Sequence, residues 1–319
     1  MAELYGGIDL GGTSVKCALG TEGGEIVLER SIETKGHLGP EKVLERIGDC
    51  MHELVEEAGE SLNAVGMGVP GLVDVERGIT RFLPNMTSHW RDVPAGETLS
   101  NRLGCPVRLL NDVRVATLGE LAYGQGRDSR DMVFIAIGTG IGGGLVIDGK
   151  LHLGPLGAAG ELGHQTIDPN GPLCGCGNHG CLETLASGTA LAAEGIRLML
   201  MGLAPTLHEI VDGDPGRVTA ETVGEAAEED EPVRDAVLHA ASYLGIGVAN
   251  VVTTLHPDLV VLGGGVSNMG EILIERVRDE VRRRVGLFPV DNIRIEQSEL
   301  GSKAGVLGAI ALGAHGFPS

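Results

Sequence analysis

The feature that most constrains this chain is a strand, glycine turn, strand pattern that occurs twice. The first copy spans 4–19 and reads LYGGIDLGGTSVKCAL, with its turn at 11–13. The second spans 132–147 and reads MVFIAIGTGIGGGLVI, with its turn at 138–140. Each predicts a hairpin whose turn offers backbone N–H groups to an anion such as phosphate, because glycine leaves no side chain in the way. One such turn also fits an ordinary hairpin, but two predict a chain of two related halves.

Strands and helices alternate along the rest of the chain. An amphipathic helix is predicted over 40–58 and a buried strand over 64–74. A strand at 106–110 leads directly into Asn111, Asp112 and a helical pattern. Ligands of α/β folds bind at the carboxyl ends of strands, so Asp112 is a candidate catalytic carboxylate. The alternative is a helix N-cap, which Asn and Asp often provide.

A third strand end rich in glycine follows near the C-terminus. The strand is predicted over 258–268 and opens onto three glycines. A helix over 270–285 ends in three arginines, a favourable charge cluster for a helix C-terminus, to which we assign no ligand. A strand over 292–297 and a helix of small residues over 302–313 complete the pattern.

One short segment concentrates metal-binding side chains. Residues 161–183 read ELGHQTIDPNGPLCGCGNHGCLE and contain His164, Cys174, Cys176 and Cys181. Three thiols and one imidazole are the tetrahedral ligand set that Zn²⁺ prefers, and they leave no position for a catalytic water. We therefore predict a closed, structural zinc site. The alternative is free or disulfide-bonded thiols, although cysteines separated by one residue cannot easily pair with each other.

Composition limits the partners of the chain. The 319 residues fit two domains with a cleft between them, and 52 glycines favour close backbone approaches to small polar ligands. A net charge of −20 without a basic run argues against nucleic acid. No signal peptide or membrane-spanning run is visible, so no membrane partner is expected. Isolated Cys17, Cys50 and Cys105 are typical of reduced thiols, and a cytoplasmic protein is predicted.

Seven motifs follow one another along almost the whole chain. They are GIDLGGTSVK at 7–16, GVPG at 68–71, LLND at 109–112, AIGTGIGGGLV at 136–146, ELGH at 161–164, CGCGNHGCLE at 174–183 and VLGGGVS at 261–267. In this order they resemble the ROK family of bacterial sugar kinases and sugar-responsive repressors, most of all its glucokinases. The resemblance implies an α/β, two-domain actin-like (ribonuclease H-like) sugar kinase fold with a deep interdomain cleft. We expect a small α/β domain of 1–111 plus 302–319 and a large α/β domain of 112–301 with the zinc loop.

The resemblance also implies a reaction. ATP would phosphorylate a hexose, most simply glucose to glucose 6-phosphate, with Asp112 as the general base that takes the hydroxyl proton. Asp9 would hold Mg²⁺ through water. Lys16 would face phosphate or lie on the surface as a structural lysine. The nucleotide contacts that follow are Asp9, Gly11, Gly12, Thr13, Lys16, Gly138, Thr139, Gly140, Gly263, Gly264 and Gly265.

Sugar contacts follow from the same resemblance. They are Gly71, Asn85, Asn111, Asp112, Glu161, His164 and Glu183, with Gly71 and Asn85 at the rim. An ionised carboxylate only accepts hydrogen bonds, so it suits paired sugar hydroxyls. His164 would give one ring nitrogen to zinc and the other to the sugar, which ties the metal to recognition. The alternative for Glu161 and Glu183 is an exposed loop carboxylate.

Two departures from the glucokinase pattern keep alternatives open. Arg114 stands in Val113-Arg114-Val115 where glucokinases commonly show small residues, and it would contact a phosphate or point to solvent. No bulky aromatic follows Cys181, so fructose, mannose, allose, N-acetylglucosamine and N-acetylmannosamine stay open as acceptors. ADP or polyphosphate stays open as the donor.

The competing class is a sugar-responsive regulator from the same family. Its members carry a helix-turn-helix before the sugar domain, whereas the first hairpin here begins near Leu4, so we expect no such domain in this chain. The acidic charge also argues against DNA binding. Family members are often dimers or tetramers, so a homo-oligomer is expected.

Overall fold

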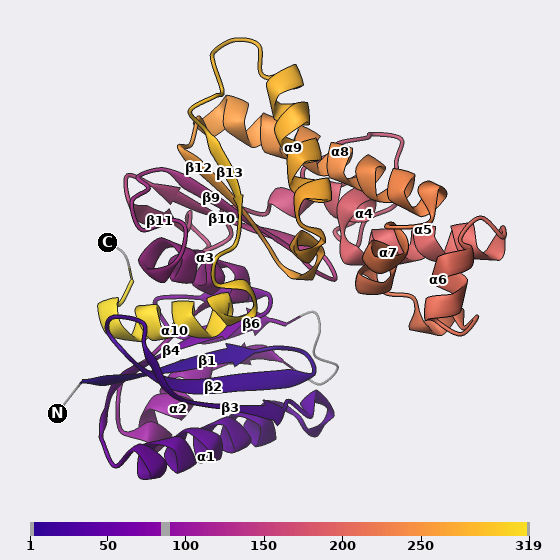
Figure 1. Cartoon of the computed structure of the whole chain (residues 1–319). Helices are drawn as coiled ribbons and strands as arrows, with labels where there is room; N and C mark the ends of the chain where they lie inside the picture. Colours follow the sequence, from indigo (N-terminus) through magenta and orange to yellow (C-terminus); the bar gives the residue numbers. More distant parts are fainter. Residues whose placement is uncertain (1–2, 84–89, 318–319) are drawn as a thin grey trace. The chain divides into compact units, whose positions relative to one another are not determined.

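The computed structural model describes residues 3–83 and 90–317 (Figure 1). It divides into two compact units. Unit 1 comprises Met1–Arg130, Gly144–Ala159 and Glu299–Ser319, and unit 2 comprises Asp131–Gly143 and Gly160–Ser298. These boundaries differ from those of the predicted domains, which assigned 112–130, 144–159 and 299–301 to the larger domain.

Unit 1 is built on a sheet with the strand order β3-β2-β1-β4-β8. Its strands are β1 (Leu4–Leu10), β2 (Ser14–Thr21), β3 (Ile26–Glu33), β4 (Leu62–Val69) and β8 (Val107–Asn111). The antiparallel pairing of β1 with β2 confirms the predicted first hairpin. β4 runs parallel to both β1 and β8, so the carboxyl ends of these three strands meet at one edge of the sheet. A further small sheet contains β5 (Leu72–Asp74), β6 (Ile79–Phe82) and β7 (Arg91–Val93).

Helices cover both faces of this sheet (Figure 1). One core cluster joins buried residues of β1, β2 and β4 to α1 (Pro40–Ala58) and α2 (Ala95–Leu103). On the opposite face, α10 (Ala304–His315) packs on Tyr5 and Ala18. Glycine allows α10 to lie close to the strands, because a Cβ at Gly7 would approach the Val306 carbonyl oxygen to 2.5 Å.

The packing of α3 (Asp112–Tyr123) explains why 112–130 belongs to unit 1. Gly119 of α3 lies so close to α10 that a Cβ there would approach the Ala304 carbonyl oxygen to 2.5 Å. A Cβ at Gly308 of α10 would overlap the Val115 carbonyl. The two helices therefore touch backbone to backbone, an attachment that sequence order does not reveal.

The second sheet has the order β11-β10-β9-β12-β13. Its strands are β9 (Met132–Ile137), β10 (Ile141–Ile147), β11 (Lys150–His152), β12 (Leu259–Gly263) and β13 (Arg294–Gln297), and the unit boundary falls within β10. β12 runs parallel to β9 and to β13, while β10 and β11 are antiparallel. In chain order this repeats the pattern of the first sheet, as two related halves predict.

Helices of unit 2 carry most of its remaining residues. They are α4 (Leu182–Ala186), α5 (Gly188–Leu200), α6 (Pro205–Ile210), α7 (Ala220–Ala226), α8 (Glu231–Leu255) and α9 (Glu271–Arg284). Among the described helices, α8 alone is long and apolar enough to cross a membrane, but 56% of its apolar window is buried within the protein. It packs on α9, α4 and α5, as a core helix does.

Candidate functional site

Asp112 lies where β8 ends and α3 begins, and the structure separates its two predicted roles. Asn111 is the N-cap of α3, since its Oδ1 accepts hydrogen bonds from the N–H groups of Val113 at 3.0 Å and Arg114 at 3.4 Å. Asp112 Oδ1 accepts a further bond from Val113 N at 2.9 Å. The helix is thus capped by Asn111, which leaves the second oxygen of Asp112 for other chemistry.

A second carboxylate lies at the same edge of the sheet. Asp9 of β1 pairs in register with Gly68 of β4, and Gly68 pairs with Leu110 of β8. A Cβ at Gly68 would lie 3.5 Å from the Asp112 Cα. Asp9 also rests against the first turn of α10, where a Cβ at Gly305 would approach Asp9 Oδ2 to 2.5 Å. A glycine therefore lies against each of these two residues, Gly305 against Asp9 and Gly68 against Asp112.

The two carboxylates have perturbed proton affinities. Burial raises the pKa of Asp112 to about 6, with the Val113 N–H and Arg114 opposing the rise and Asp9 adding to it. Burial also raises the pKa of Asp9, and the positive charge of Lys16 partly offsets this. A carboxyl group with a pKa near the working pH is suited to accept a proton during catalysis.

The first glycine turn, at 11–13, is ordered by its own backbone. Gly11 N donates to Ser14 O at 2.9 Å, and Thr34 Oγ1 donates to Gly11 O at 2.7 Å. Gly12 and Thr13 are exposed at the tip. Lys16 Nζ donates to the Ser302 carbonyl oxygen at 2.8 Å, so this side chain ties β2 to the turn before α10.

The second glycine turn, at 138–140, is held by the start of α5. Gly188 N donates to Gly138 O at 2.8 Å, and Thr189 Oγ1 donates to Thr139 O at 2.7 Å. A Cβ at Gly140 would overlap the Glu183 carboxylate, so a larger residue there would displace that side chain. Glu183 Oε2 accepts from Ile141 N at 2.9 Å, which joins this turn to the start of α4.

A cavity of about 1190 Å³ opens from this turn within unit 2. Gly138, Thr139 and Gly265 line it, together with residues of α5, α7 and the 3-10 turn η4 (Gly265–Met269). A Cβ at Gly138 or Gly265 would meet no atom within 4 Å, and neither residue has a positive φ. The fold itself does not demand glycine at these two positions, so they fit the close approach of a ligand.

The other two glycines of the third strand end have structural reasons. A Cβ at Gly263 would approach the Phe134 ring to 2.7 Å. Gly264 has a φ of 82°, and its Cβ would press on the Ile137 backbone. Only Gly265 of the three lies among the residues that line the cavity.

Sequence reasoning missed most of the wall of this cavity. Thr189, Thr219, Glu221 and Asn268 line it from α5, the start of α7 and η4. The capping box of Thr219 and Thr222 marks where α7 begins but gives no sign that the helix borders a cavity.

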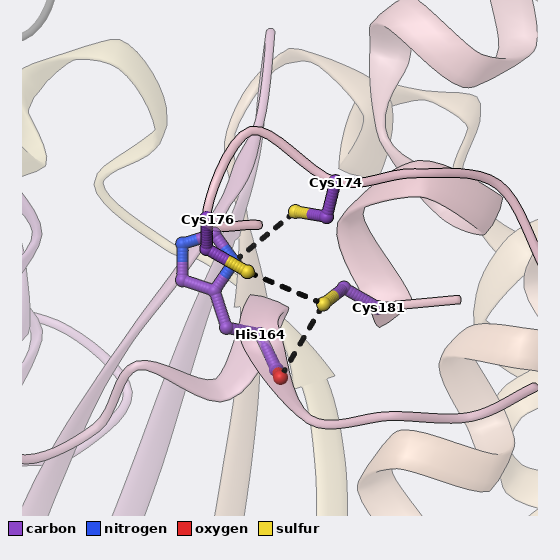
Figure 2. Close-up of side chains that lie close together, drawn as sticks. All are labelled: His164, Cys174, Cys176 and Cys181. Atoms are coloured by element: carbon purple, nitrogen blue, oxygen red, sulfur yellow. Dashed lines mark hydrogen bonds between the residues drawn. The ribbon is translucent and has the colours of Figure 1, made fainter. Parts of the chain in front are cut away.

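The predicted metal ligands gather into one cluster (Figure 2). The ligand atoms of His164, Cys174, Cys176 and Cys181 all lie within 4.8 Å of one another. His164 Nδ1 is 3.5 Å from Cys174 Sγ, and the Sγ atoms of Cys176 and Cys181 are 3.7 Å apart. In a tetrahedral zinc site the bonds are about 2.3 Å to sulfur and about 2.1 Å to nitrogen. They place nitrogen and sulfur about 3.6 Å apart and two sulfurs about 3.8 Å apart. The His164–Cys174 and Cys176–Cys181 distances therefore match two edges of a zinc coordination shell.

The remaining predicted sugar contacts fall into both units. Gly71, with a φ of 86°, accepts a hydrogen bond from Asn111 Nδ2 at 3.1 Å in unit 1. Glu161 is exposed in unit 2, and the His164 Nδ1 that faces Cys174 leaves Nε2 as the outer ring nitrogen. Asn85 lies outside the described residues.

The chain is similar to known proteins over almost its whole length. The model of the ROK family matches residues 5–315. A glucokinase from Thermotoga maritima is 37% identical over 313 residues, which cover 96% of each chain. A xylose repressor from Caldicellulosiruptor bescii is 34% identical over 310 residues, covering 96% of this chain and 77% of the repressor. A ROK family glucokinase from Streptomyces griseus, solved with glucose and AMPPNP, is 33% identical, with a TM-score of 0.84 over 98% of this chain and 100% of that chain.

Proposed function

The chain belongs to the ROK family and is a sugar kinase with the actin-like α/β fold, and from that premise we propose that it phosphorylates glucose with ATP. The observation that carries the proposal is Asp112. It lies at the carboxyl edge of the sheet, Asn111 caps its helix, and burial raises its pKa to about 6. A carboxylate of this kind can take the proton from a sugar hydroxyl as the hydroxyl oxygen attacks the γ-phosphorus of ATP.

The proposed phosphate contacts are the two glycine turns. Gly11, Gly12 and Thr13 would approach the transferred phosphate, with Asp9 holding Mg²⁺ through water. Mg²⁺ on ATP neutralises charge that develops on the phosphate oxygens. Gly138, Thr139, Gly140 and Gly265 would approach the nucleotide in unit 2, and Gly263 and Gly264 would support that strand end. Lys16 would act through the turn before α10 to which it is bonded.

The proposed sugar contacts are Gly71, Asn85, Asn111, Asp112, Glu161, His164 and Glu183. Asn111 would donate the second N–H of its amide, since the first is used by Gly71 O. His164 would use Nε2 for a hydroxyl while Nδ1 faces the thiols. Zinc at the cluster would be structural, because His164, Cys174, Cys176 and Cys181 fill a tetrahedral shell. Its part would be to fix the orientation of the His164 ring.

The test is a coupled phosphorylation assay with Mg-ATP against a panel of sugars. Glucose should be turned over fastest, followed by fructose, mannose, allose and the N-acetylhexosamines. A different preferred sugar would overturn the glucose assignment and keep the kinase. Polyphosphate and ADP belong in the same panel as donors, and ATP should exceed both.

A sugar-responsive regulator is the second candidate, favoured by the 34% identity with a xylose repressor. It predicts sugar binding without turnover of any sugar in the panel. A homo-oligomer in the cytoplasm, dimeric or tetrameric, completes the proposal, and light scattering at assay concentration measures the oligomeric state.

A further inference from the structure

Arg114 is buried in unit 1, although it stands only two residues after Asp112. It is 2% exposed and is among the largest fully buried side chains of the described residues. This burial rules out the solvent-facing role that the sequence left open. A buried guanidinium costs free energy unless its N–H groups are bonded, so its contacts indicate why the chain retains it.

Two of these contacts reach different segments of unit 1. Nη1 donates to Asn111 Oδ1 at 3.0 Å, and Nη2 donates to the Ala159 carbonyl oxygen at 2.9 Å. The guanidinium is planar and its donors have a fixed geometry, so these bonds fix the distance and the angle between the two acceptors.

The bond to Asn111 sets the direction of that amide. Its Oδ1 accepts from Nη1 of Arg114 as well as from two N–H groups of the α3 first turn. Because Oδ1 accepts from three donors, the amide cannot flip. A flip would exchange the oxygen for the NH₂ group and place that group against the same three N–H donors. Nδ2 is therefore held toward Gly71 O, at 3.1 Å.

The bond to Ala159 holds the end of a short loop, residues 153–159. Ala159 N donates to Leu153 O at 2.9 Å, and its carbonyl oxygen accepts from Arg114. Both peptide groups of the loop's last residue are thus fixed. Glu161, a proposed sugar contact, follows two residues later in the chain.

We propose that Arg114 is a positioning residue for phosphoryl transfer, which fixes the Asn111 amide and, through Ala159, the backbone that leads to Glu161. This inference rests on the proposed function, because it names those residues as sugar contacts. It assigns Arg114 no contact with the sugar or with phosphate.

The charge of Arg114 has a second effect, on Asp112. The charged groups that act on the Asp112 carboxylate are Asp9 of β1, which raises its pKa, and Arg114 of α3, which lowers it. Lys16 of β2 acts on Asp9. Removal of the guanidinium charge should therefore raise the pKa of Asp112 and shift the acid side of the pH-rate profile upward.

The experiment compares Arg114→Met with Arg114→Lys. Arg114→Met removes the charge and both bonds. It should raise the KM for sugar about five- to twentyfold and move the acid limb of the kcat/KM profile to higher pH. Arg114→Lys keeps the charge but cannot reach two acceptors in a plane, so it should restore the acid limb and leave the KM raised. Arg108→Met is the matched control, since Arg108 Nη1 also donates to a backbone oxygen, that of Gly313 at 2.9 Å. It should change neither quantity.

A readout without turnover separates this inference from the proposed function. The free energy of unfolding is measured against pH for each protein and for its Asp112→Asn variant. The difference between the two curves changes with pH, and the midpoint of that change reports the pKa of Asp112. The midpoint should rise in Arg114→Met and not in Arg114→Lys, even if no sugar is phosphorylated. If Arg114→Met fails to fold, Arg114→Gln serves as the neutral variant. An unchanged sugar KM in folded Arg114→Lys, or an unchanged midpoint in the neutral variant, would overturn the inference.

Discussion

The two glycine hairpins share a topology but differ in what surrounds them. The turn at 11–13 is accompanied by charged groups, Asp9 and Lys16 on its strands and Asp112 on the same unit. The turn at 138–140 is accompanied by space, a cavity of about 1190 Å³, and by backbone contacts from α5. The comparison teaches that two copies of one frame can be surrounded differently, and the proposed function gives proton transfer to the first copy and nucleotide binding to the second.

The largest effect on turnover should come from the first unit, where charged groups accompany the turn at 11–13. Asp112→Asn keeps the size of the side chain and the bond from Val113 N but removes the base, so kcat should fall about 10²- to 10⁴-fold. Sugar affinity measured by calorimetry should change little. Asp74→Asn, a carboxylate bonded to Arg77 N in the same unit, is the control and should keep near-normal kcat. Turnover close to wild type in Asp112→Asn would remove the division of roles.

Loss of the metal should come next in size. Cys176→Ser should release zinc and weaken sugar binding about 10- to 100-fold, because the His164 ring loses the group that orients it. Metal content by atomic emission and sugar affinity by calorimetry are measured on the same sample. Cys105→Ser removes another thiol of the chain, one outside the cluster, and should alter neither. Loss of zinc with unchanged sugar affinity would separate the cluster from recognition.

The second hairpin, whose turn at 138–140 borders the cavity, should be sensitive to larger side chains at its glycines. Gly265→Ala and Gly138→Ala place a methyl group where no atom lies within 4 Å, so folding should tolerate them while the KM for ATP rises about tenfold. Gly264→Ala is the opposite case, since its positive φ and the nearby Ile137 backbone should make it destabilising. Steady-state kinetics and thermal melts distinguish the two classes. An unchanged KM for ATP in both cavity variants would break the assignment of this copy to the nucleotide.

The smallest effect concerns stability and pH. Asp112 has a pKa of about 6 in the folded protein, above the usual 3.8. Its contribution to stability is therefore complete below about pH 4 and is lost as the pH rises through about 6. Asp112→Asn should be more stable than wild type at pH 8 by about 1–3 kcal/mol, with the difference shrinking toward pH 4.5. Denaturant unfolding at several pH values measures this, and equal stability at pH 8 would contradict the raised pKa.

Local patterns made much of the fold predictable. The first hairpin, the helix over 40–58 and the start of α3 depend on neighbouring residues, and each lies where the sequence placed it. The Cys/His cluster was predictable for the same reason, because its four residues fall within 18 positions of the chain and their chemistry is distinctive. The strand β3 was not predicted, because half-buried and exposed residues alternate along it at a sheet edge and several of them are charged.

Contacts between distant residues were not predictable. Nothing about Thr189 or Glu221 alone shows that α5 and α7 border one cavity. The sequence left Arg114 either a phosphate contact or a place in solvent, and its bond to Ala159, 45 positions away, became visible only in the fold. The packing of Gly119 on α10 depends on a segment near the far end of the chain, which is why the boundary at 112 differs from that of the units.

The close seating of α10 has a consequence for how the protein is made. The sheet that it covers is synthesised first, from residues 4–111, whereas α10 comes from residues 304–315. A ribosome adding about 5–20 residues each second leaves that sheet face, with Tyr5, Ala18 and Ala64, uncovered for about ten seconds or more. The nascent chain therefore presents a half-finished first unit to chaperones and to other nascent chains until its last helix emerges.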